Sequence, residues 1–315
     1  EAIDSRAASG PNRIVRTAEE ARREVDRQVA AGVDAVKLYS ALPPAAARAA
    51  IAEAHARGIP AIGHLGATTW SEAALAGIDG IEHGAPWTED WLAPADRAVY
   101  RTAVREQGGM KARIVWLERL NVDGPEVAAA VSTLARRHVA VDPTLIAYAT
   151  KFRGDDPRYI ASPDLARVPA RLLAEWRRGT FVSDWSEDDF RRAHAAWPKL
   201  LRLVRLYHDH GVMLLAGSDL PNPWVVPGVS FHQELALLAE AGIPPRDVLR
   251  IATRNGAQAL GLLAEAGTLE PGKRADLVVL TADPLQDIRN TRSIEAVMQG
   301  GVWRSGRAEA AAPGR

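Results

Sequence analysis

The chain has 315 residues, which is enough for one large domain with a smaller unit beside it. Its 39 basic residues balance its 39 acidic residues, so no overall positive charge favours a nucleic acid or membrane partner. Cysteine is absent from the sequence, which excludes disulfides, thiolate metal sites and cysteine nucleophiles. Any metal must therefore be held by His, carboxylate or modified Lys side chains.

The first part of the chain alternates predicted helices with predicted strands. Thr17 is expected to cap the first helix and Gly32 to end it. The predicted helices cover 17–32, 43–58 and 71–77, and the predicted strands cover 34–40, 59–66 and 78–84. Such alternation with short connections is typical of parallel βα units.

The alternation loosens after Gly84 and returns in the second half of the chain. The predicted strands there cover 138–145 and 211–219, and the predicted helices cover 187–210, 231–242 and 244–261. The long connection 150–187 is typical of a lid or binding element. Two stretches near the end, GTLEPGKRADLVVLTADPL and SIEAVMQGGVW, indicate short strands in a small β unit.

Five strands of the βα type can be counted. They end near Tyr39, His64, His83, Leu145 and Asp219. A closed (β/α) barrel needs about eight strands. Because five parallel strands would leave open apolar edges, either strands are missing from this chain or the fold is not a barrel.

Lys37 lies within the first of these strands. Because strand side chains alternate, Val36 and Leu38 share a face suited to packing under helices, and Lys37 points to the other face. An inward Lys is costly unless something pairs with it. Taken alone, Lys37 is better interpreted as a rim residue that reaches solvent.

Two histidines and an aspartate stand at strand ends, where barrel enzymes place their chemistry. One strand-end histidine is usually a capped or core residue, but His64 and His83 on successive strands favour a metal site, since imidazole is the commonest metal ligand. Asp219 follows Gly217-Ser218, which allows close approach of backbone to a ligand. It is either a turn former or a functional carboxylate.

Together these motifs resemble the amidohydrolase superfamily. Lys37 in VKLY, His64 in IGHLG, His83 in IEHG and Asp219 in AGSD match the order of that superfamily's strands four, five, six and eight. GTLEPGKRADLVVLTADPL is similar to its C-terminal β-sandwich signature. EAHARG and GIDGIEHG resemble its imidazolonepropionase and Xaa-Pro dipeptidase (prolidase) branch, and the resemblance covers nearly the whole chain.

The resemblance implies both a fold and a reaction. The fold would be a (β/α)8 TIM barrel, incomplete in this chain, of which residues 1–262 hold strands four to eight. A small β-sandwich portion at 263–308 and a tail at 309–315 would follow. The reaction would be metal-dependent hydrolysis of an amide or peptide C–N bond in a small substrate such as a dipeptide or an N-acyl amino acid.

The same resemblance implies a role for each motif residue. Lys37 would be carboxylated and would bridge two divalent metals, most often zinc. His64 and His83 would hold the second metal. Asp219 would bind the first metal and act as general base on the bridging water, while the metals polarise the carbonyl.

One family feature is missing from the sequence. Family members carry a His-x-His pair on strand one, whereas the HDH at 208–210 ends a predicted helix. We therefore expect that the chain lacks its N-terminal part and that by itself it holds one metal or none. The alternative is a catalytically impaired or partner-completed scaffold. A related deaminase is disfavoured, because such enzymes usually lack the bridging Lys.

The substrate pocket is harder to predict. The candidates for substrate contact are Tyr39, Thr144, Tyr148 and His232, each of which has ordinary packing as its alternative. Arg153 and Arg158 are candidates for pairing with a substrate carboxylate. The expected partner is a small molecule, with no nucleic acid or membrane, and a homo-oligomer is left open. The cytoplasm is the favoured compartment. The assignment is left open, because a signal peptide further upstream would leave no trace in this sequence.

Overall fold

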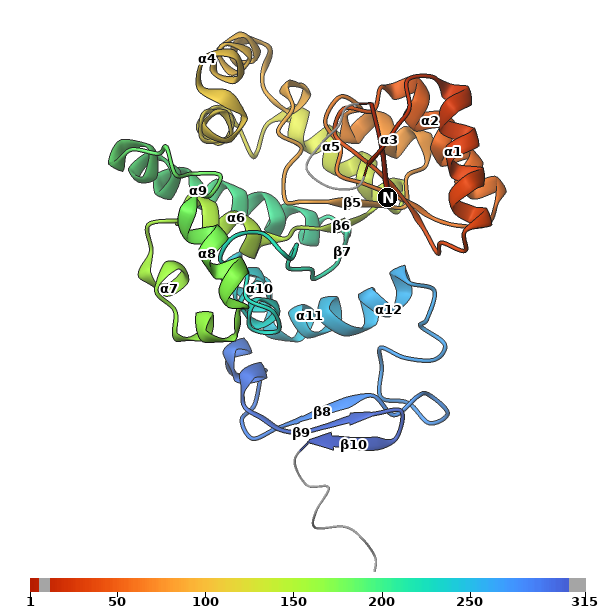
Figure 1. Ribbon diagram of the computed structural model, residues 1–315, viewed down its shortest axis with the longest axis vertical. Coiled ribbons are helices and arrows are strands. Elements are labelled where there is room, and N and C mark those ends of the chain that lie inside the picture. Colours follow the sequence, from red (N-terminus) through yellow and green to blue (C-terminus); the bar gives the residue numbers. More distant parts are fainter. Residues whose placement is uncertain (6–11, 306–315) are drawn as a thin grey trace, which may run out of the picture.

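Residues 1–5 and 12–305 are described by the computed structural model, and they form two sheets with helices around the larger one (Figure 1). The larger sheet has seven parallel strands in the order β2-β1-β3-β4-β5-β6-β7. Its strands are β1 (Ala2–Asp4), β2 (Asn12–Ile14), β3 (Val36–Leu38), β4 (Ala61–Gly63), β5 (Gly80–Glu82), β6 (Ala140–Asp142) and β7 (Met213–Leu214). The five strands predicted from the sequence are present, and the α/β class is confirmed.

The structure corrects the expected strand count, because the parallel sheet has seven strands instead of five. β1 and β2 were not among the predicted strands, because each has only three residues and neither lies in an alternating stretch. Within the described ranges the sheet is open, with β2 and β7 as its edges. No ladder joins these two edges there, so the closed eight-stranded barrel of the family is not seen in this part of the chain.

The helices that connect successive strands pack beside one another in the order of the strands. They are α1 (Ala18–Ala30), α2 (Pro44–Ala56), α3 (Trp70–Ala76), α5 (Pro125–Arg136) and α9 (Glu187–Asp209). In α1, Thr17 and Glu20 form a capping box, as the predicted Thr cap required. Val36 and Leu38 are fully buried, which confirms that this face of β3 lies under helices.

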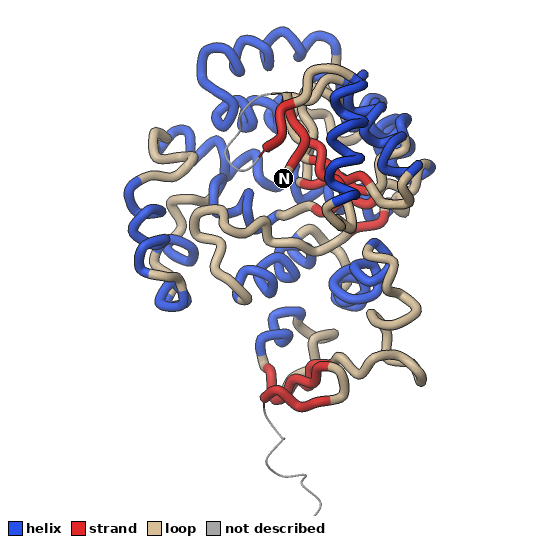
Figure 2. Tube along the Cα trace, turned by 45° about the vertical axis from the view of Figure 1, so that its right-hand side comes forward, coloured by secondary structure: helices blue, strands red, loops and turns tan. Residues whose placement is uncertain are grey.

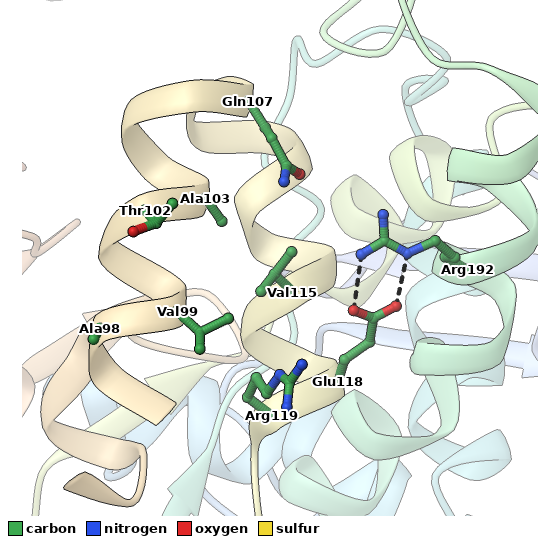
Figure 3. A pocket seen from close by; sticks show the side chains of 9 residues that line it. All are labelled: Ala98, Val99, Thr102, Ala103, Gln107, Val115, Glu118, Arg119 and Arg192. Carbon is green, nitrogen blue, oxygen red and sulfur yellow. Dashed lines mark hydrogen bonds and ion pairs between the residues drawn. The ribbon is translucent and has the colours of Figure 1, made fainter. Parts of the chain in front are cut away.

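Helix α4 (Pro94–Arg119) is bent back on itself at Gly108, whose φ is 79°. The two arms of α4 lie side by side next to α9, and Glu118 accepts two hydrogen bonds from Arg192 across this contact (Figure 3). A pocket of about 500 Å³ opens between the arms. None of the predicted site residues lines it, so it plays no part in the site described below.

The long connection predicted at 150–187 contains short helices of its own. These and the neighbouring helices are η1 (Glu89–Trp91), α6 (Leu145–Phe152), α7 (Pro157–Ile160), η2 (Pro163–Arg167), α8 (Ala170–Arg178), α10 (Val229–Glu240), α11 (Pro245–Arg250), η3 (Ile251–Asn255, a π turn) and α12 (Gly256–Ala259). Trp176 is buried in a separate apolar cluster with Leu165 and Val226. This cluster anchors the connection against the loop that precedes α10.

The second sheet is antiparallel and stands at one end of the molecule (Figure 2). Its order is β10-β9-β8, with β8 (Leu277–Leu280), β9 (Ile294–Gln299) and β10 (Val302–Ser305), and η4 (Ile288–Arg292) precedes β9. These strands match the predicted C-terminal β unit. The domain boundary at 262/263 stays a prediction, and residues 306–308 and the predicted tail 309–315 lie outside the described residues. No helix among the described residues has the length and apolarity needed to cross a membrane.

The packing of α2 on the sheet predicts a large cost for a cavity there. Ile51 is fully buried in α2, whereas Leu75 in α3 is 60% exposed. We expect Ile51→Ala to lower the free energy of unfolding by about 2–4 kcal/mol, and Leu75→Ala to change it by less than about 0.5 kcal/mol. Urea denaturation followed by circular dichroism measures both variants. Equal losses would contradict this description of the core.

Candidate metal centre

The polar residues predicted for the site follow neighbouring strands of the parallel sheet. Tyr39 follows β3, His64 follows β4, His83 follows β5, Thr144 follows β6 and Asp219 follows β7. The carboxyl ends of parallel strands meet at one edge of a sheet, and this edge is where α/β proteins place their ligands. The fold therefore delivers all five side chains to the same edge.

Lys37 points to the face of β3 away from the helices and finds a partner there. In the sheet register Lys37 stands beside Ile62, which stands beside Gly80. Glu82, two residues after Gly80, therefore shares this face, and its Oε2 lies 2.7 Å from Lys37 Nζ. The ion pair offsets the cost of turning an ammonium group inward, and the Lys37 side chain is still 37% exposed.

His64 and His83 face each other at the sheet edge. Nδ1 of His64 and Nε2 of His83 are 2.6 Å apart, and the other nitrogen of His83 lies 2.9 Å from Thr144 Oγ1. The ring of Tyr39 is stacked on His64 at 4.7 Å, and the ring of Tyr148 meets His83 edge-on at 5.6 Å. The two imidazoles are thus held in position from both sides.

Burial keeps both imidazoles neutral. Desolvation, with the nearby charges of Arg113, Lys37 and Lys151, lowers the pKa of His64 to about 4. Desolvation and its neighbour His64 hold the pKa of His83 well below its ordinary value. A metal binds an unprotonated imidazole nitrogen, so neutral rings favour metal binding. One of the two facing nitrogens carries the proton of their hydrogen bond and would have to give it up to bind a cation.

Glu82 joins the two histidines in a group that fits a metal ion. One ligand atom from each of His64, Glu82 and His83 lies within 4.8 Å of the others. Two neutral nitrogens and a carboxylate oxygen are donors that zinc accepts. The donor chemistry of the residues present therefore fits a divalent metal at this place, beside Lys37.

Asp219 lies outside that three-residue group. It has a left-handed backbone, with φ 55°, and its Oδ2 accepts a hydrogen bond of 2.8 Å from Asn222 Nδ2. Lys151 Nζ in turn donates to Asn222 Oδ1 at 2.9 Å. Asp219 is close enough to raise the pKa of Tyr39 and of Tyr148, although burial is the larger cause for both. Asp219 therefore lies near enough to these two tyrosines for its charge to act on them.

Asp142 ties the end of β6 to the loop after β7. Its Oδ1 accepts a hydrogen bond of 2.9 Å from Gly217 N. A Cβ on Gly217 would lie 2.0 Å from Asp142 Oδ2, so only glycine fits there. Burial raises the pKa of Asp142 to about 6, against the lowering effect of the Gly217 and Thr144 amides. The close approach allowed by Gly217 is thus to a carboxylate of this chain.

Glu234 fixes the segment that carries Thr144. It is fully buried in α10, and its two oxygens accept from the amides of Leu145 at 2.9 Å and Ile146 at 2.6 Å. These amides open α6, immediately after Thr144, whose backbone is left-handed with φ 45°. Burial raises the pKa of Glu234 to about 8.

Six non-glycine residues in the described part of the chain have left-handed backbones, and three of them, His83, Thr144 and Asp219, are predicted site residues. Such conformations cost free energy and gather at functional sites. Successive residues of a strand normally point to opposite faces. The left-handed backbone of His83 allows its imidazole and the carboxylate of the preceding Glu82 to lie in the same group of metal donors. This observation adds an independent sign that the edge is specialised.

The remaining candidate histidines lie elsewhere. His232 Nδ1 contacts Thr291 Oγ1 at 2.9 Å, in η4, rather than joining the other candidates. His208 lies 3.5 Å from Asp247, and His210 contacts the carbonyl of Leu206 at the end of α9. Because α9 leads into β7, both lie at the amino end of that strand, away from the candidate centre.

Comparison with known proteins places the chain in a family. Residues 6–304 match the profile of the Amidohydrolase family. The chain belongs to this family. It is 36% identical over 99 residues to the imidazolonepropionase of Deinococcus deserti, a match that covers 31% of this chain and 24% of that protein. The relatives agree with the imidazolonepropionase- and prolidase-like branch expected from the sequence.

Two solved structures show the same fold. A bottromycin amidohydrolase superposes with a TM-score of 0.72 at 23% identity, covering 98% of this chain and 64% of that one. A Xaa-Pro dipeptidase superposes with a TM-score of 0.61 at 17% identity, covering 93% and 60%. This amidohydrolase chain therefore spans less than two-thirds of these structural neighbours, and its match spans about a quarter of the curated relative.

Five residues at the site were missed by the sequence analysis: Glu82, Asp142, Lys151, Asn222 and Glu234. Glu82 had a usable signal, because it lies two residues after Gly80 and next to a predicted ligand. Asp142 ends β6 in the structure, but the predicted strand was expected to end near Leu145. Lys151 and Glu234 belong to helices and carry no local signal, because only tertiary packing buries them.

The buried Glu234 predicts a stability that falls as pH rises. Its folded pKa of about 8 lies above the unfolded value of 4.5, so between these values the unfolded chain has lost a proton that the folded chain keeps. Unfolding free energy should therefore fall by up to about 1.4 kcal/mol per pH unit in this window through this group. Glu234→Gln should remove that slope.

Urea denaturation of wild type and Glu234→Gln at about pH 5, 6.5 and 8 measures the difference in unfolding free energy between the two proteins. These pH values lie between the unfolded and the folded pKa of Glu234, where linkage predicts the slope. An unchanged difference between the two proteins at all three values would contradict the raised pKa.

Proposed function

We propose that this amidohydrolase hydrolyses a C–N bond of a small amide or peptide, using divalent metal held at the carboxyl edge of its parallel sheet. The observation that carries the proposal is the group of His64, Glu82 and His83, whose donor atoms lie within 4.8 Å of one another beside Lys37. Membership of the family and the imidazolonepropionase and dipeptidase relatives support the same reaction class.

His64 and His83 are proposed as ligands of one metal, with Glu82 as a further carboxylate donor. A metal bound there would supply hydroxide at neutral pH and polarise the substrate carbonyl. Thr144 holds His83 through Nδ1, so that Nε2 faces His64 and the open side of the site. Tyr39, stacked on His64, restricts the space in which the amide lies.

Lys37 is proposed to be the carboxylated residue that bridges two metals. Its amine is now paired with Glu82 at 2.7 Å. A carbamate on Lys37 would place two anions side by side, an arrangement that is stable only with cations between them. Carboxylation and metal binding should therefore occur together. Asp219 is proposed as the general base and as a ligand of the first metal, reached after release from Asn222.

The second candidate is a scaffold that another chain completes. The open sheet edges and the absence of a His-x-His pair other than 208–210 favour it. A folded chain that binds no zinc would support this candidate over the enzyme.

For the hydrolase, zinc is the proposed metal, and the substrate is proposed to be a dipeptide or an N-acyl amino acid.

The metal assignment predicts which histidines control affinity. Isothermal titration of the metal-free chain with zinc should show one or two sites, and His64→Asn or His83→Asn should weaken binding at least about 100-fold. His194→Asn is the matched control, because this exposed histidine pairs only with Asp155, at 2.8 Å. Similar losses in all three variants would rule out the proposed ligands.

The hydrolase assignment predicts loss of activity without Lys37. We expect a panel of dipeptides and N-acyl amino acids to include a substrate whose hydrolysis a chelator stops and zinc restores. Lys37→Ala should lower kcat/KM for that substrate by about 10³-fold or more, since it removes the proposed bridge. Full activity of Lys37→Ala, read by amine release, would end the bridging proposal.

A further inference from the structure

Two cations beside the candidate metal centre have no acidic partner in the described part of the chain. Lys151 in α6 is 8% exposed, and its Nζ donates to the carbonyl of Ala147 at 2.8 Å and to Asn222 Oδ1 at 2.9 Å. Arg113 in α4 makes no ion pair, and its polar contact is to Met110 Sδ at 3.8 Å. Each therefore keeps N–H donors that nothing in this part of the chain uses.

Both cations lie against the ring of Tyr148. Lys151 Nζ is 5.4 Å and Arg113 Cζ is 5.5 Å from the centre of that ring, and Arg113 also lies 5.2 Å from the ring of Trp87. Tyr148 itself meets His83 edge-on at 5.6 Å. The two positive charges thus stand within one aromatic ring of the proposed metal ligands.

The two charges repel each other and lose hydration where they lie. Burial and the charge of Arg113 lower the pKa of Lys151 to about 7, and Asp219 is the one acid that opposes this. Aromatic rings, including Phe181 at 5.2 Å from Lys151 Nζ, supply part of the surroundings. A buried cation with no anion destabilises a fold, whereas an anion arriving in such surroundings binds strongly.

Arg153 and Arg158, the two arginines named in the sequence analysis, are not available to bind an anion. Arg153 is paired with Glu240 at 2.5 Å, and Arg158 is paired with Asp156 at 2.6 Å. Their charges are already neutralised by acids of the chain. Arg113, and Lys151 in its protonated form, are the cations at the site that have no acidic partner in the described part of the chain.

We propose that Arg113 and Lys151 form a subsite for the carboxylate of the substrate, beside the metal donors His64 and His83. In an N-acyl amino acid or a dipeptide, the carboxylate is separated from the amide nitrogen by a single carbon, so a carboxylate at the cations would keep the scissile bond on the side of Tyr148 where His83 lies. The subsite rests on the proposed function and assigns Arg113 and Lys151 as the residues that would distinguish its dipeptide and N-acyl amino acid substrates from neutral amides.

Binding of a matched pair of ligands tests the subsite without relying on turnover. The probes are N-acetyl-L-proline and N-acetyl-L-prolinamide, which differ in the carboxylate, titrated calorimetrically into the zinc-loaded full chain. Wild type should prefer the acid. Arg113→Met and Lys151→Met should each weaken binding of the acid by about 10- to 100-fold and leave binding of the amide unchanged.

Controls separate charge from folding. Arg202→Met removes an exposed arginine of α9 that pairs with Asp123, and this variant should keep the preference for the acid. Arg113→Lys retains the charge and should recover part of the affinity. Lys151→Met replaces a buried cation by an apolar side chain of similar volume, so the Tm of this variant should be no lower than that of wild type.

The two proposals fail in different ways. If wild type binds acid and amide equally, or if both Met variants keep the preference for the acid, the subsite is wrong whatever the chain hydrolyses. If the preference is present and lost in the variants while no amide in the panel is hydrolysed, the subsite stands and the hydrolase assignment fails.

Discussion

The proposed chemistry of this amidohydrolase depends on one arrangement of charge at the carboxyl edge of a parallel sheet. Two imidazoles are buried deeply enough to stay neutral, and next to them an inward lysine is paired with a glutamate. The two parts are linked, because an inward lysine without an acidic partner would repel a cation bound at the imidazoles. The sheet makes the arrangement possible, since neighbouring parallel strands bring residues far apart in sequence to one edge.

Buried polar contacts hold this edge in place. Glu234 binds two amides at the start of α6 and so fixes Thr144, which holds His83. Asp142 fixes the loop of Gly217 at the end of β7. Buried carboxylates of this kind are costly, as their raised pKa values show. These carboxylates lie next to His83, Thr144 and Asp219, which have left-handed backbones. The unfavourable burial therefore stabilises the backbone conformation of the site.

Much of this arrangement follows from patterns in the sequence. Alternation of side chains predicted that Val36 and Leu38 pack under helices while Lys37 turns away, and the strand-end positions of His64 and His83 predicted their meeting. Local patterns do not show which helix residues become buried, so the sequence analysis missed Glu234 and Lys151. It named Arg153 and Arg158 as candidate carboxylate partners, with plain solvation as the alternative. The structure instead pairs Arg153 with Glu240 through a tertiary contact and Arg158 with its near neighbour Asp156.

The central claim is that a metal is bound between the strand-end imidazoles, and anomalous diffraction from a zinc-soaked crystal tests it most directly. Data collected on both sides of the zinc absorption edge locate the ion without assumptions about activity. We expect a peak about 2.0–2.1 Å from Nδ1 of His64 and Nε2 of His83, with the two nitrogens further apart than their 2.6 Å separation without metal. Crystals in which this position stays empty, or in which zinc binds only at surface histidines, would contradict the account.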